Sequence, residues 1–476
     1  MPIGLSREVN KTAGRARLEA TAVLLIGLAA TSIFLPSEGD VISIFAFAAI
    51  GVGVSLTVAT VVEGLQGVRS LIRVDLLMLW VLYGLTFFEF LFPQDALDTG
   101  LTVAAAKNGT IATCLGFAGL SIGRHLVPFR SKSKFAAFTD VQPRSIFALF
   151  VFATLVGYFH ILWAVNFDPI EMIRQMLLPR FQQSWGRERY GGDISALLFE
   201  VGALIYLIPP LAGLMYARSN DFSTLQRAIV TLVLLLTIFY GFTGGTRNVL
   251  ATYLITFFGA YYLNKQKIKF WKLALQGGGV VALLLVASQL MLEFRSAGAT
   301  NFSYSNAQRA SVYIDRNLIV ISRLTEVFPD TYDFLGWDIP YHILIHPIPR
   351  MLWAGKPEGL SVTVESVVGT DQATIASTFV GESYMAGGML GVLLAGILFG
   401  AGGEMWNRVG RDARMPFSQL LYASGFFCAA ISMRSALWMS VTMLPTLALW
   451  LYGKLWLSRA SRRRTHPLTS SGGKEV

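Results

Sequence analysis

The sequence predicts an all-α, polytopic integral membrane protein with about 12 transmembrane helices, and three observations lead to this fold class. Hydrophobic residues make up 54% of the 476 residues, charged residues only 14%, and the mean hydropathy is +0.54. Apolar runs of about 20 residues, enough to cross a bilayer, follow one another along most of the chain. Most of the 39 Lys and Arg residues fall in alternate connections, so the net charge of +10 reflects topology and indicates no nucleic-acid partner.

The apolar runs place the predicted spans at 20–36, 41–62, 72–93, 101–122, 145–166, 194–217, 228–243, 248–264, 273–294, 379–402, 417–433 and 436–457. Residues 1–19 and 458–476 are then a cytoplasmic N-terminus and a cytoplasmic tail. Helices fill 20–166, 194–294 and 379–457. Two periplasmic loops separate these blocks, a medium one at 167–193 and a long one at 295–378. The first two periplasmic connections, SEGD and PQDALDT, carry no Lys or Arg, as the positive-inside pattern requires.

The remaining cationic residues gather in three periplasmic segments. The medium loop contains RFQQSWGRERYGG, in which Arg180 and Arg187 lie near Trp185. The second segment is the turn GFTGGTRN, whose glycines let the backbone pass close to another group and whose Arg247 lies at the membrane surface. The third is the long loop. Planar guanidinium groups beside aromatic rings suit a ligand that is both phosphorylated and sugar-like.

The long loop is predicted to begin with a helix and to continue as an irregular segment. Ser305 and Gln308 form a capping box, and the helical period runs to Phe328. The helix would align three arginines seven residues apart, of which only the last has an acid, Glu326, at helical distance; they are Arg309, Arg316 and Arg323. A solvated charged face is the alternative interpretation. Four prolines in DIPYHILIHPIPRMLWAGKPEG predict no regular helix there, and the segment presents His346, Arg350, Trp353 and Lys356.

Ionisable residues inside predicted spans are costly, so they indicate pairing or function. Glu89, Glu382 and Arg434 fall in the periplasmic halves of their helices, and Lys107 is expected to pair with Glu89 or with Glu200. The glycines around Glu382 are also explained by close helix packing. Cys114 and Cys428 lie in apolar runs and build neither a disulfide framework nor a thiolate site.

Several motifs resemble those of a known family. They are GGTRN at 244–248, HPIPRMLWAGKPEG at 346–359, GESYMAGGMLGV at 381–392, and an R-x10-G spacing from Arg180 to Gly191 that has no second copy in the long loop. With the topology, they resemble the Wzy-type polymerases of O-antigen and exopolysaccharide repeat units, which are distantly related to the O-antigen ligases. The resemblance implies a GT-C-like architecture in the bacterial inner membrane, with the active site facing the periplasm. The reaction would transfer a growing glycan from undecaprenyl pyrophosphate to a new lipid-linked repeat unit.

The resemblance also implies roles for residues and partners. Arg247 would stabilise the leaving pyrophosphate, and Glu382 or His346, with Asp315 behind them, would act as general base. Pyrophosphate and sugar contacts are expected from Arg180, Arg187, Arg309, Arg316, Arg350, Trp353 and Lys356. No cofactor and no metal are expected. The partners would be undecaprenyl-pyrophosphate-linked oligosaccharides, membrane lipids, a chain-length regulator and a flippase.

Three other functions fit parts of the sequence. A ligase-like glycosyltransferase would use the same donor and a different acceptor. A polysaccharide or lipid transporter would share the number of spans, although transporters usually show repeated halves. A metal-dependent transferase would use Glu38 and Asp40 of the first periplasmic connection as metal ligands.

Overall fold

The structure is a computed structural model that describes residues 3–94, 100–127, 138, 141–185, 194–265, 268–304, 314–353, 355–357, 359–369 and 376–465. Every regular element in these ranges is helical. Seven described helical stretches are long and apolar enough to cross a membrane: Gly14–Ile33 in α1 (Ile3–Ile33), α2 (Val41–Gly64), α5 (Pro143–Ala164), α9 (Thr224–Thr243), α11 (Phe270–Ala297), α16 (Thr378–Asp412), and Ala436–Leu455 in η8 (Ala436–Trp438) and α18 (Met439–Thr465). The chain is therefore a multi-pass helical membrane protein.

The other predicted spans also coincide with helices, although these are shorter or less apolar. They are α3 (Val74–Thr86) with η2 (Phe88–Leu91), α4 (Val103–Gly123), α7 (Ile194–Val201) with η6 (Gly202–Leu207) and α8 (Ile208–Ala217), α10 (Arg247–Leu263), and α17 (Pro416–Arg434). The count of about 12 spans stays a prediction.

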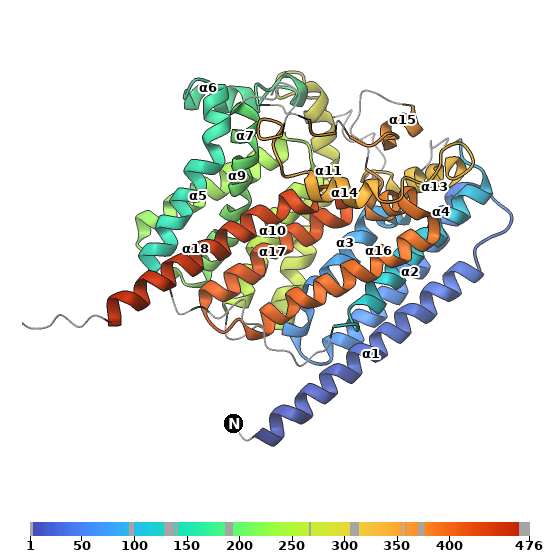
Figure 1. Cartoon of the computed structure of the whole chain (residues 1–476), viewed down its shortest axis with the longest axis horizontal. Coiled ribbons are helices and arrows are strands. Elements are labelled where there is room, and N and C mark those ends of the chain that lie inside the picture. Colours follow the sequence, from blue (N-terminus) through green and yellow to red (C-terminus); the bar gives the residue numbers. More distant parts are fainter. Residues whose placement is uncertain are drawn as a thin grey trace, which may run out of the picture.

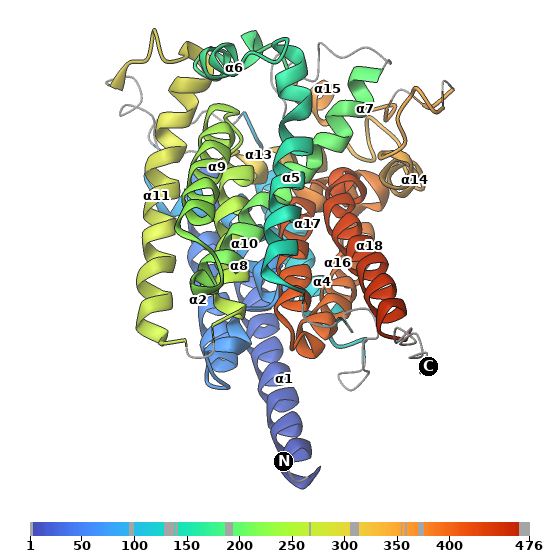
Figure 2. The ribbon, with the colours of Figure 1, turned by 90° about the vertical axis from the view of Figure 1, so that its left-hand side faces the viewer.

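The helices form a bundle with two distinct ends (Figures 1 and 2). The start of α1 and the end of α18 lie at one end, which we call the terminal end. The opposite end, which we call the loop end, carries the short helices of the two long connections: α6 (Pro169–Met176), α13 (Asn317–Val327), α14 (Asp338–Ile345) and α15 (Val364–Val368). Among the described residues of the predicted site, Arg180, His346, Arg350 and Lys356 belong to these two connections.

Two hydrophobic cores hold the bundle together, and α17 belongs to both. One core joins buried side chains of α1, α2, α3, α4, α13 and α16, and the other joins α5, η6, α8, α9 and α18. Phe426 and Met433 of α17 pack in the first core, while Phe417 and Leu421 pack in the second. The last residue of α17, Arg434, is therefore carried to the loop end by the helix that connects the two halves.

Helix α16 is broken near the loop end. Gly387 and Gly388 leave the helical conformation, and Gly388 has a φ of 61°, which glycine adopts without strain. The backbone of the long loop bonds the carbonyl groups just before the break. Leu335 N donates to Met385 O at 2.8 Å, and Gly336 N donates to Ala386 O at 3.0 Å. The first part of α16, which contains Glu382, is thus a short helical segment held against the long loop. Small-residue packing is found further along, where a Cβ on Gly400 would lie 2.2 Å from Leu120 O of α4.

A buried ion-pair network, which we call the terminal-end cluster, joins five helices near the termini. It consists of four arginines and three carboxylates: Arg17, Arg73, Arg124, Arg411, Glu63, Asp75 and Glu404. Three of its ion pairs, Arg17 to Glu404, Arg73 to Glu63 and Arg124 to Glu63, have N–O distances of 2.6 Å. Burial, with Arg124 and Arg17 close by, lowers the pKa of His125 to about 4, so His125 adds no charge at neutral pH.

Two sequence predictions for the long loop are wrong where the structure describes it. The helix predicted from Ser305 to Phe328 does not continue through residues 314–316, because Arg316 has a left-handed backbone (φ 52°) and α13 begins only at Asn317. Arg316 and Arg323 therefore do not share one helical stripe. The proline-rich segment does contain a helix, α14, since Pro340 lies in its first turn, where a missing N–H costs nothing.

Candidate functional site

Arg247 is the first residue of α10 and follows a tight turn. Thr246 is the N-cap, and Gly245 has a φ of 65°. Gly245 also lies against the side chain of Arg295 from the end of α11, because a Cβ at this position would be 2.8 Å from Arg295 Cδ. The glycine of the turn therefore allows the Arg295 side chain to lie against the backbone two residues before Arg247.

The segment Ile314–Arg316 is held by three elements of the loop end. Glu89 of η2 accepts a hydrogen bond from Ile314 N at 2.8 Å, and Arg247 donates to Ile314 O. On the other side, Arg434 Nε donates to the Asp315 carboxylate at 3.2 Å. Arg316 itself is exposed. These contacts explain why the helical period fails here, since tertiary bonds to side chains replace the helical ones.

Arg180 is linked to Arg295 by an aromatic ring that both guanidinium groups contact. The guanidinium groups of Arg180 and Arg295 lie 5.9 Å and 5.4 Å from the centroid of the Phe181 ring, which is about half exposed. The backbone after α11 also contacts the backbone of the medium loop, because Ala299 N donates to Leu177 O at 2.8 Å. The medium loop and the end of α11 therefore form one surface.

The structure thus joins the three segments that the sequence predicts to be periplasmic. We call the group the loop-end cluster; its members are Arg180, Arg247, Arg295, Arg316, Arg434, Glu89 and Asp315. Arg295 was not selected from the sequence as a site residue, and Arg434 was noted only as a charge inside a span. Arg187 and Arg309, also predicted to bind substrate, lie outside the described residues. Glu89 does not pair with Lys107 as expected, since its carboxylate bonds the backbone of Ile314.

The other predicted residues form a second group around His346. Its Nδ1 lies 3.1 Å from Leu437 O, and its ring packs edge-on to Trp438 with centroids 4.7 Å apart. Lys356 Nζ donates to His346 O at 3.0 Å and to Ile348 O at 2.9 Å, which closes the loop that follows α14. Arg350 donates to Pro357 O at 3.4 Å within the same loop, and Trp353 is half-buried in it. A carbonyl accepts only, so Nδ1 carries the proton and Nε2 is the basic nitrogen of the neutral ring.

Glu382 lies between the two groups and is almost fully buried, with 5% of its surface exposed. Its Oε1 accepts from Ser435 Oγ, and its Oε2 accepts from Ala436 N at 2.6 Å and from Leu437 N at 3.3 Å. The carboxylate therefore caps the start of η8, the helical turn that leads into α18.

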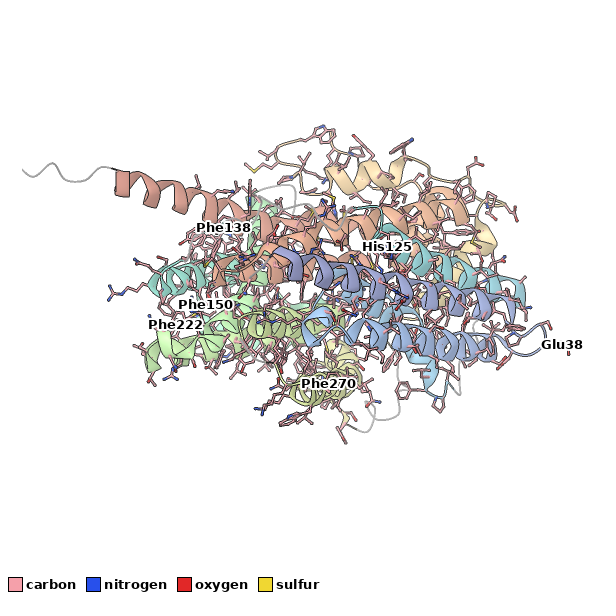
Figure 3. All side chains as sticks on the ribbon, turned by 90° about the horizontal axis from the view of Figure 1, so that it is seen from below. Glu38, His125, Phe138, Phe150, Phe222 and Phe270 are labelled. Atoms are coloured by element: carbon pink, nitrogen blue, oxygen red, sulfur yellow. The ribbon has the colours of Figure 1, made fainter. Side chains whose placement is uncertain are left out.

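Two further expectations concern aromatic platforms and metal ligands. Trp185 is buried against Tyr240 and is 4% exposed, so its face is not presented to a sugar. Asp40 caps α2 by accepting from Ser43 N at 2.9 Å. Glu38 lies at one edge of the molecule, at the tip of the connection between α1 and α2 (Figure 3). Within the described ranges, no group of three or more His, Cys, Asp or Glu side chains has an arrangement that could hold a metal ion.

The fold and the site define a multi-pass membrane protein whose polar centre is built from arginines at one end of a helical bundle. Residues 195–428 match the model of the family described as "Putative O-antigen polymerase". The matched region contains three of the four motifs that carried the resemblance, all except the spacing from Arg180 to Gly191, and the resemblance is thereby confirmed. It includes Arg247, His346 and Glu382 and ends before Arg434. No curated protein and no solved structure matches the chain. That family implies a membrane glycosyltransferase-type activity on lipid-linked oligosaccharides.

Proposed function

We propose that the protein is a polysaccharide polymerase of the bacterial inner membrane, acting on O-antigen or exopolysaccharide repeat units at the periplasmic face. It transfers a growing glycan from undecaprenyl pyrophosphate to a new lipid-linked repeat unit. The observation that carries the proposal is the convergence of guanidinium groups from separate segments on residues 314–316 and on the turn before α10. The loop end is the part of the bundle where a carrier's pyrophosphate would lie while its polyprenyl tail remains in lipid.

The loop-end cluster suits a pyrophosphate leaving group. As the bond from the anomeric carbon to the pyrophosphate oxygen breaks, negative charge grows on the leaving group and must be neutralised. Guanidinium forks bind phosphate oxygens in pairs, and the N-terminus of α10 places the positive end of the helix dipole next to Arg247. The proposed mechanism obtains its positive charge from these groups without a metal ion.

His346 is the general base that the geometry supports best. The acceptor hydroxyl oxygen forms the new bond to the anomeric carbon, and its proton passes to Nε2 of the imidazole. The other two candidates already bind donors: Asp315 accepts from Arg434, and both oxygens of Glu382 accept from residues 435–437. Arg350, Trp353 and Lys356 belong to the same loop and are proposed to contact the sugars. Arg187 and Arg309 keep their proposed role in pyrophosphate binding.

Deletion of the gene tests the proposed function. Cells without the protein are expected to make surface glycan with at most one repeat unit, because chain growth is lost while export and ligation continue. A ligase would give a different result, since polymerised glycan would accumulate on its lipid carrier without reaching the final acceptor. A transporter would leave unpolymerised lipid-linked units inside the cell. Complementation with the wild-type chain should restore the full ladder of chain lengths.

A further inference from the structure

Glu382 lies where the two groups of the candidate site meet. Its carboxylate accepts hydrogen bonds from one short turn. The turn runs from Arg434 to Trp438. Arg434, at its start, reaches Asp315 in the loop-end cluster, while Leu437 O and the Trp438 ring hold His346. The Glu382 carboxylate accepts the donors in the middle of the turn. One side chain therefore fixes the backbone that separates an arginine from the imidazole.

The support behind Glu382 is rigid. Its helical segment, Thr378–Ala386, is buried along most of its length and ends at the break in α16. The long loop closes this break with hydrogen bonds from Leu335 N and Gly336 N. Phe334, next to Leu335, packs edge-on to Tyr384 and lies against Gly388. A carboxylate on such a support holds its hydrogen-bonding partners in place with little freedom.

We propose that Glu382 is a positioning residue, which sets Arg434 and His346 at the correct separation and orientation for glycosyl transfer. The inference rests on the proposed function and deepens it. It assigns Arg434, which lies beyond the region matched by the family model, to the pyrophosphate-binding arginines. It also replaces the role of general base considered for Glu382 from the sequence, because both carboxylate oxygens are occupied by donors from residues 435–437.

The Glu382→Gln and Glu382→Ala variants separate the two roles. Glutamine has the same shape, its carbonyl oxygen still accepts from Ala436 N and Leu437 N, and its amide donates to Ser435 Oγ, which can also accept. It takes up no proton at neutral pH. A positioning role therefore predicts that Glu382→Gln loses less than about tenfold in kcat/KM, whereas Glu382→Ala loses about 100-fold because the turn shifts. A general base would lose about 100-fold or more in both variants.

The assay uses purified protein in proteoliposomes and lipid-linked repeat units extracted from the deletion strain. Glu326→Gln is the matched control, because Glu326 is a carboxylate at the same end whose contacts are with Arg323 and Thr102. Thermal unfolding of each variant, measured in the same membranes, separates a misfolded protein from a misplaced site. Inactive wild-type protein would refute the proposed function, whereas active wild-type with an inactive, folded Glu382→Gln variant would refute only the positioning role.

A double-mutant cycle then tests whether Glu382 acts through Arg434. If it does, adding Glu382→Ala to Arg434→Lys costs much less in kcat/KM than adding Glu382→Ala to the wild type. A purely structural carboxylate gives additive losses, and this result would overturn the inference. The pH profile of kcat/KM supplies a second readout. Glu382→Gln should keep the acidic limb of the wild-type profile. Loss of that limb would show that Glu382 itself is the general base.

Discussion

The two ends of the bundle use arginine in opposite ways. In the terminal-end cluster, four arginines meet three carboxylates, and each of these arginines forms an ion pair. The loop-end cluster contains five arginines and two carboxylates. Glu89 accepts a hydrogen bond from a backbone amide, and Asp315 accepts one from Arg434. Arg247 donates to a backbone carbonyl there. The four arginines and three carboxylates of the first cluster leave a surplus of one positive charge, whereas the five arginines and two carboxylates of the second leave a surplus of three among its members.

The difference shows that the number of arginines alone does not identify a functional site. Both ends place guanidinium groups on several helices, and both contain ion pairs between distant parts of the sequence. A buried network of matched charges fixes helices in one arrangement, because removal of one member leaves an uncompensated charge. A cluster with surplus positive charge is suited to an anion that arrives from outside. The predictions below test this contrast between stability and activity.

The largest effect is expected on stability at the terminal end. Glu404 is fully buried and pairs with both Arg17 and Arg411, at 2.6 Å and 2.7 Å. Glu404→Ala should therefore lower the free energy of unfolding by about 3–5 kcal/mol. Thermal unfolding in membranes measures the change, and the activity of the protein that remains folded should be close to normal. An unchanged midpoint would show that the network does not stabilise the fold.

The next effect concerns activity at the loop end. Arg247→Lys keeps the charge and loses the planar fork, so we expect transition-state stabilisation to fall by about 2–4 kcal/mol while the protein level stays normal. The matched control is Arg323→Lys. Arg323 lies at the same end but is paired with Glu326 at 2.6 Å, and its replacement should have a much milder effect. Chain lengths of surface glycan in complemented deletion cells report both. If cells with Arg247→Lys made glycan with the full range of chain lengths, other arginines would have to bind the pyrophosphate.

The orientation of the bundle gives an all-or-none test. In a variant without Cys114 and Cys428, the only cysteines of the chain, single cysteines can be placed at exposed positions. Tyr304→Cys and Trp337→Cys belong to the loop end, where these side chains are 61% and 84% exposed. Both should react with a membrane-impermeant reagent added to the periplasm, and Asn220→Cys, between α8 and α9, should not. The reverse labelling would place the loop-end cluster in the cytoplasm and contradict the proposed chemistry.

Several parts of the site could be predicted from the sequence because they depend on local signals. The turn before Arg247 is short and rich in glycine, and the Arg323–Glu326 pair follows from helical spacing. The family resemblance rested on local motifs and is confirmed. These signals survive because tertiary contacts do not alter the geometry of a tight turn or of two neighbouring residues on a helix.

Other parts could not be predicted, since they depend on contacts between distant residues. The helical period continues through Ile314, but Glu89, 225 residues away, and Arg247, 67 residues away, bind its backbone instead. The donors that occupy Glu382 lie 53 to 55 residues further along the chain. Without them, a buried acid beside an arginine-rich loop looks like a general base. Arg295 was missed because contacts with distant residues, Gly245 and the Phe181 ring, bring it to the site.

The central claim is that the loop-end cluster neutralises a departing pyrophosphate without help from a metal ion. The most direct measurement uses proteoliposomes with purified protein, lipid-linked repeat units and excess EDTA. It follows elongated glycan and free undecaprenyl pyrophosphate together. We predict one undecaprenyl pyrophosphate released for each repeat unit added, at the same rate with and without EDTA, and strong loss of both products in Arg247→Lys. Transfer that stops in EDTA and returns with a divalent cation would contradict the claim.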